Sequence, residues 1–176
     1  MKFPLNKIIR PFLLTLLVLT VLEIISSSFF PLLGLSQFYI PFNLVILFYL
    51  AIRLETPFLA FLVLLIQYSH SLFTIENWAV GTFIGVLICR IVSKFRDLIQ
   101  ISNLPLTILV VQIFLMCWHL IYSIFYYFQT GGKAIFFVRF FPIFIEGLLA
   151  SVVSYHLFLF LDIIWFSGKE RELGGV

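Results

Sequence analysis

Long apolar runs separated by short polar breaks fill the chain between residues 11 and 166. A membrane-spanning helix needs about 20 consecutive apolar residues, with about 17–25 tolerated. The pattern therefore predicts an all-α, polytopic transmembrane bundle of about six helices in a single domain, residues 1–176. The predicted spans cover residues 11–30, 38–54, 57–73, 78–95, 104–128 and 142–166.

Prolines, glycines and capping residues mark the expected ends of these runs. Pro11 suits the first position of a helix, where the missing N–H costs nothing. Pro31 and Gly34 are expected to end the first helix. Asn77 can cap the helix that starts at residue 78, because its side chain can accept a hydrogen bond from an early backbone N–H.

The last apolar region, residues 134–166, is too long for one simple span. We interpret 134–141 as an aromatic, interfacial segment that bears Arg139, and we place the start of the sixth span at Pro142. A single tilted or kinked helix is the rival interpretation.

Composition supports a membrane setting. The chain is 62% hydrophobic and 11% charged, and its mean hydropathy is +1.17. A soluble domain averages about 45–50% apolar and about 25% charged residues. A net charge of +3 is too small to indicate a nucleic-acid partner.

The basic residues are unevenly divided between the two predicted sides of the membrane. Cytoplasmic loops carry an excess of Lys and Arg. With the N-terminus inside, nine of the 11 basic residues fall on the cytoplasmic side, and only Lys133 and Arg139 fall outside. We therefore expect a multi-pass protein of the bacterial inner membrane with both termini in the cytoplasm. The first span is expected to stay uncleaved, because no A-x-A-like site follows it.

Ionisable residues inside a membrane are candidates for function or for helix contacts. Glu23 lies near the middle of the first span and could relay protons, bind a ligand or hydrogen-bond another helix; we favour the interhelical contact. Glu146 lies about one turn into the sixth span, where Arg139 could pair with it. Gly81 and Gly85 form a G-x-x-x-G that permits close helix approach, to this chain or to a partner.

Polar residues near the predicted outer side could line a small-molecule pocket. They are Gln67, Ser69, His70, Glu76 and Asn77, together with Glu146. A shared metal site is not expected, because the three histidines lie on different spans at different depths. The sequence holds no Walker A, HExxH, GxSxG or dinucleotide-binding motif, so we expect neither an enzyme nor a cofactor.

The second span and its surroundings resemble the MreD family of rod shape-determining membrane proteins. That family opens its second span with a Pro-Asn/Asp-like pair, followed by an aliphatic run that ends in Tyr-x-Ala-x-Arg. The matching residues are Pro41, Asn43, Tyr49, Ala51 and Arg53, with Phe42 inserted after the proline. A two-span hairpin and a basic break at residues 94–97 follow in the same order as in the family.

The resemblance implies a non-enzymatic part of the bacterial cell-elongation machinery, which builds the peptidoglycan cell wall. Its partner would be the single-span protein MreC and, through it, the enzymes of peptidoglycan synthesis and the MreB filament. It also implies a six-helix fold similar to the substrate-binding subunits of energy-coupling-factor transporters. One departure is clear, because the family's Asp and Ser-Gly-type turn at the end of the third span are replaced by residues 67–73.

Three hypotheses follow. The first is a scaffold that binds single-span membrane proteins. The second is a substrate-binding subunit of a vitamin-type transporter, which would use the predicted outer pocket. The third is a membrane enzyme or proton-coupled transporter that uses Glu23 and Glu146.

Overall fold

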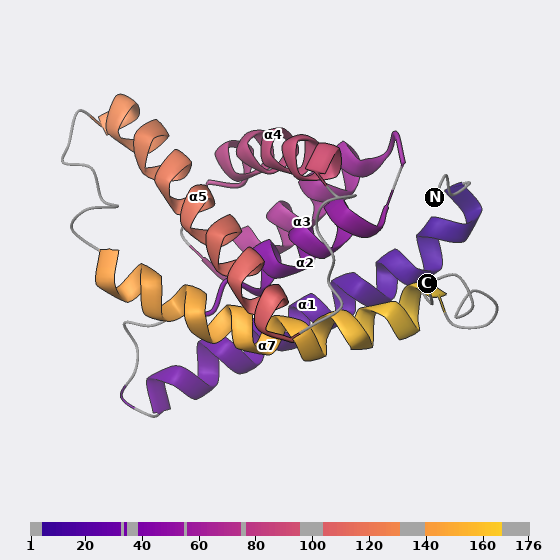
Figure 1. Ribbon diagram of the computed structural model, residues 1–176, viewed down its shortest axis with the longest axis horizontal. Coiled ribbons are helices and arrows are strands. Elements are labelled where there is room, and N and C mark those ends of the chain that lie inside the picture. The colour runs from indigo at the N-terminus through magenta and orange to yellow at the C-terminus, as the bar shows by residue number, and fades with distance from the viewer. Residues whose placement is uncertain are drawn as a thin grey trace.

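The computed structural model describes residues 5–32, 34, 39–54, 56–74, 77–95, 104–130 and 140–166, which hold six helices (Figure 1). The helices are α1 (Leu5–Leu32), α2 (Phe42–Arg53), α3 (Leu59–Ser71), α4 (Trp78–Phe95), α5 (Leu104–Thr130) and α7 (Phe140–Phe166). The described part of the chain contains no strand, so the all-α prediction is confirmed there.

Four helices, α1, α4, α5 and α7, are long and apolar enough to cross a membrane. The predicted spans 38–54 and 57–73 correspond to α2 and α3, which are shorter than predicted, at 12 and 13 residues. At a rise of about 1.5 Å per residue they measure ~18 Å and ~20 Å, well short of a hydrocarbon core of about 30 Å. The bundle therefore combines four long helices with two short ones.

The short helix α2 forms the centre of the bundle. Every residue from Phe42 to Ala51 is buried, and α2 contacts each of the other helices. Figure 1 shows α2 and α3 between α4 on one side and α1 and α7 on the other. A helix that is apolar on all sides suits the central position that α2 occupies.

The ends of α1 differ from the prediction. Pro11 lies inside the helix rather than at its first position, and α1 continues through Pro31 to Leu32. A proline removes one backbone donor, but membrane helices tolerate this where neighbouring groups compensate. The chain turns only at Gly34, whose φ of +72° favours glycine and whose N–H donates to the Pro31 carbonyl at 3.1 Å.

The other predicted helix ends agree more closely with the structure. The Asn77 side chain accepts a hydrogen bond from the Ala79 N–H at 3.0 Å, as expected of a cap on α4. The helix α7 begins at Phe140, two residues before the predicted start at Pro142. The last two residues of the predicted interfacial segment are therefore helical, and residues 134–139 lie outside the described part of the chain.

Gly81 and Gly85 pack against α3 of the same chain. A Cβ at Gly81 would lie 2.9 Å from Gln67 Oε1, and one at Gly85 would lie 2.7 Å from Val63 Cγ1. Both distances are shorter than van der Waals contact, so the two glycines set how closely α4 approaches α3. The G-x-x-x-G thus serves an interface within this chain.

We expect Gly85→Ala to destabilise the protein by about 1–3 kcal/mol, because the new methyl group would overlap a β-branched side chain that cannot move aside. Gly147→Ala is the matched control. Its Cβ would meet only the flexible end of Gln112, at 2.9 Å, and alanine is the better helix former. Thermal unfolding in detergent micelles measures both; equal losses for the two variants would contradict the close contact at Gly85.

Candidate functional site

A buried carboxylate–imidazole pair joins α1 to α3. Glu23 Oε1 lies 2.9 Å from His70 Nδ1, and the two side chains are 0% and 3% exposed. When Nδ1 carries its proton, it donates to the carboxylate. Each group would be costly to bury alone, so the contact between Glu23 Oε1 and His70 Nδ1 offsets part of that cost for both. Of the uses expected for Glu23, the interhelical contact is the one that the structure shows.

Tyr39 connects this pair to α7. Its hydroxyl lies 3.4 Å from His70 Nδ1, and its backbone N–H donates to Glu146 Oε1 at 3.2 Å. The segment 39–41 leads directly into α2, so these contacts fix where the central helix starts. Tyr39 thus links the two acids singled out in the sequence, contacting Glu146 directly and Glu23 through His70.

A second pair of polar side chains lies beside the first. Asn43 Nδ2, in the first turn of α2, donates to Gln67 Oε1 at 3.4 Å. Gln67 and His70 are one turn apart on α3 and share a face. Gln67 fits because Gly81 has no side chain at the point of contact. We call the group Glu23, Tyr39, Asn43, Gln67, His70 and Glu146 the buried polar layer.

Several atoms of the layer lack a partner within the described residues. They are Glu23 Oε2, Asn43 Oδ1 and Gln67 Nε2, and Ser26 Oγ on the next turn of α1 is also unpaired there. An unpaired buried polar atom costs about 1–3 kcal/mol. A layer with several such atoms has spare hydrogen-bonding capacity toward a polar molecule.

The residues predicted to line an outer pocket are divided by the structure. Gln67, His70 and Glu146 are buried in the polar layer and bonded to other side chains or backbone. Ser69 is half-buried on α3, and the exposed Asn77 caps α4. Glu76 and Arg139 lie outside the described residues. Of the described residues expected to line this pocket, Gln67, His70 and Glu146 are therefore packed within the buried polar layer, and Asn77 lies at the surface.

A second polar cluster joins the other end of α2 to α7. The Tyr49 hydroxyl donates to Asp162 Oδ1 at 2.8 Å, and Arg53 Nη2 donates to Asp162 Oδ2 at 2.9 Å. We call these three residues the Asp162 cluster. Tyr49 is fully buried, whereas the Arg53 and Asp162 side chains are 40% and 29% exposed. The predicted topology places Arg53 and Asp162 on the same side, but it gives no reason to pair them.

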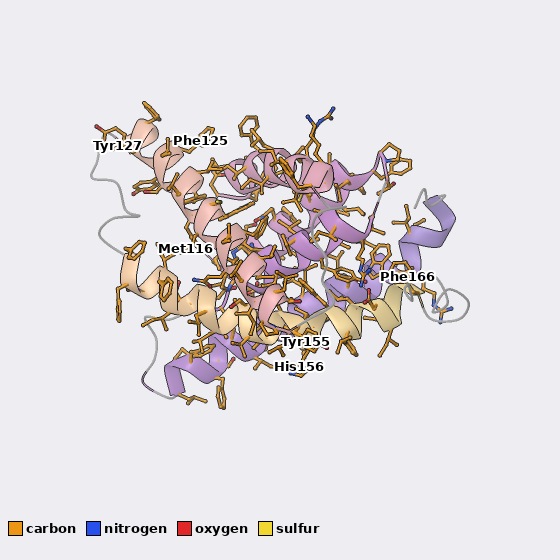
Figure 2. All side chains as sticks on the ribbon, in the orientation of Figure 1. Met116, Phe125, Tyr127, Tyr155, His156 and Phe166 are labelled. Carbon is orange, nitrogen blue, oxygen red and sulfur yellow. The ribbon has the colours of Figure 1, made fainter. Side chains whose placement is uncertain are left out.

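The histidines do not converge. His156 lies on the outward side of α7 beside Tyr155, away from the other helices (Figure 2). The described residues hold no group of three or more His, Cys, Asp or Glu side chains placed to bind a metal ion. The chemistry that the described site shows is therefore hydrogen bonding among buried polar side chains.

Comparison with protein-family models, with curated proteins and with solved structures finds no match to this chain.

We expect Glu23→Leu and His70→Leu each to destabilise the protein by about 3–5 kcal/mol, because each removes the carboxylate–imidazole contact from a buried site. The double variant should lose much less than the sum, since it removes both ionisable groups. A double-mutant cycle on unfolding in detergent measures the coupling. Additive losses would show that the two side chains do not depend on each other.

The Asp162 cluster predicts a graded result. Tyr49→Phe should cost about 1 kcal/mol, because it removes one buried hydrogen bond. Arg53→Gln should cost less than about 1 kcal/mol, since an exposed ion pair is screened by water. In the Asp162→Asn background, the free-energy costs of Tyr49→Phe and Arg53→Gln should differ by less. A larger cost for Arg53→Gln than for Tyr49→Phe would contradict this ranking.

Proposed function

We propose that this protein is a non-enzymatic membrane scaffold of the MreD kind, which holds single-span partners such as MreC in the bacterial elongation complex. The observation that carries the proposal is where the residues of the resemblance lie. Pro41 and Asn43 stand at the start of α2, and Tyr49 and Arg53 bind Asp162 at its end. The motif therefore coincides with the groups that position the central helix.

The use of polar groups supports a scaffold over an enzyme. In the described part of the chain, Glu23, Glu146 and Asp162 all engage groups on other segments of the bundle. The outward faces of the long helices are instead rich in exposed Leu, Ile and Phe. Such faces suit lipid and the apolar helix of a single-span partner, which associates by close packing in the bilayer.

The basic residues support the proposed orientation. Arg53 pairs with Asp162 near the end of α7. About one turn further along α7, the indole N–H of Trp165 donates to Thr15 Oγ1, in the first half of α1, at 3.0 Å. The start of α1 and the end of α7 thus lie at one end of the bundle, together with Arg53 (Figure 1). We propose that this end faces the cytoplasm, following the positive-inside rule.

Site-specific photocrosslinking in living, rod-shaped bacteria tests the scaffold. A photoreactive residue is placed at an exposed position on each long helix, namely Leu17, Phe83, Ile113 and Ile163, with buried Val111 as the control. We expect at least one exposed position, and not Val111, to crosslink to a single-span partner of the MreC kind. Crosslinks to lipid alone at every position would contradict the proposal.

A second candidate function is binding of a small polar molecule by the buried polar layer. The unpaired atoms Glu23 Oε2, Asn43 Oδ1 and Gln67 Nε2 favour it, because each could form a hydrogen bond with a polar ligand. Native mass spectrometry of the protein released directly from membranes should then show a stoichiometric added mass. Asn43→Leu should remove that mass, whereas Thr82→Val, at a half-buried position on α4 outside the layer, should keep it. A protein of unmodified mass would speak against this function.

A further inference from the structure

A cleft of about 390 Å³ lies between the start of α3 and the last turns of α4, outside the buried polar layer. Its lining includes Thr56, Ala60, Val86, Arg90, Ser93 and Lys94. The cleft follows from the pairing of the two helices. Gly81 and Gly85 hold α4 tightly against α3, but α3 begins only at Leu59, whereas α4 continues to Phe95. The last turns of α4 therefore face a non-helical segment, and the two elements separate.

The polar groups of the cleft favour an anion. Arg90 and Lys94 are one helical turn apart, so their cations lie on the same face of α4. The described residues that line the cleft include no carboxylate. Thr56 Oγ1 accepts a hydrogen bond from the Phe58 N–H at 3.3 Å, which leaves its O–H as a donor.

The start of α3 also favours an anion in the cleft. Its N-cap residue, Phe58, makes no side-chain capping bond, and the Leu59 N–H donates to the Thr56 carbonyl at 3.2 Å. The helix dipole of α3 favours negative charge next to the cleft. Two side-chain cations, one hydroxyl donor and the start of one helix thus all favour a negatively charged group in the cleft.

The remaining walls of the cleft are apolar. Leu59 and Val86 are half-buried, and Ala60 is exposed on the outward side of α3. An occupant that is anionic at one end and apolar at the other matches this distribution better than a soluble anion does.

We propose that this cleft is a binding site for an acidic phospholipid, with the phosphate between Arg90 and Lys94 and an acyl chain against Ala60 and Val86. Snorkelling of each cation to the interface would explain either residue alone. A bound headgroup is indicated because Arg90 and Lys94 line the same cleft and its remaining walls are apolar.

The test measures lipid retention by the full chain. The protein is released from vesicles of equal parts phosphatidylcholine and phosphatidylglycerol, and the bound lipid is identified by native mass spectrometry. We expect phosphatidylglycerol to be retained preferentially. Each removed cation should lower its retention about fivefold, so the double variant Arg90→Gln/Lys94→Gln should lose most of it.

Two further variants separate the cleft from general surface charge. Arg10→Gln removes an exposed cation on α1 outside the cleft and should leave retention unchanged. Ala60→Phe fills the cleft while keeping both cations and should lower retention as the double variant does. Equal losses for Arg10→Gln and the double variant would overturn the proposal, as would full retention in the double variant. Gel filtration checks that each variant is folded; if Ala60→Phe is not, the charge variants still decide.

A last arm distinguishes a lipid from a free anion. The delipidated protein in neutral detergent is heated with either inorganic phosphate or short-chain phosphatidylglycerol. Stabilisation by the lipid alone, lost in Arg90→Gln/Lys94→Gln, supports the proposal. Equal stabilisation by inorganic phosphate would overturn the lipid assignment and leave an anion site. Because the readouts are lipid mass and melting temperature, the result is independent of whether the scaffold function holds.

Discussion

Burial of α2 from Phe42 to Ala51 is the constraint on which the bundle depends. A helix in contact with all its neighbours can carry polar groups only where those neighbours supply partners. The protein meets this condition at both ends of α2 with carboxylates from α7. Glu146 accepts from Tyr39 just before the helix, and Asp162 accepts from Tyr49 and Arg53 at its end. Positions 146 and 162 are ~24 Å apart along α7, at about 1.5 Å per residue, and this separation fixes the axial position of α2.

Between these two ends the core is apolar. Phe48 contacts the tilted ring of Phe114 of α5 at a centroid distance of 4.7 Å and stacks on Phe158 of α7 at 6.2 Å. Such contacts stabilise packing but specify position weakly, since one apolar surface slides on another at small cost. The polar groups at the two ends supply the specificity that the middle lacks, which is the use for which buried polar contacts are best documented.

The sequence predicts the helices well and their roles less well. The start of α4 and the cap at Asn77 follow from local chemistry, and both are found in the structure. The short length of α2 could not be predicted, because a buried apolar helix and a membrane span have the same composition. The partners of Glu23 and Asp162 were equally hidden, since His70 and Arg53 lie far away in sequence and hydropathy does not specify which helices are neighbours.

The dependence of α2 on α7 has a consequence for how the chain is made. The ribosome releases α2 early, but Asp162 and Glu146 belong to the last of the described helices. Until α7 arrives, Tyr49 and Arg53 lack their shared partner, Asp162, and α2 is too short to cross the bilayer by itself. Native assembly is therefore a late event that requires the whole helical region. A chain that stops before α7 would present an unfinished core to the quality-control proteases of the membrane.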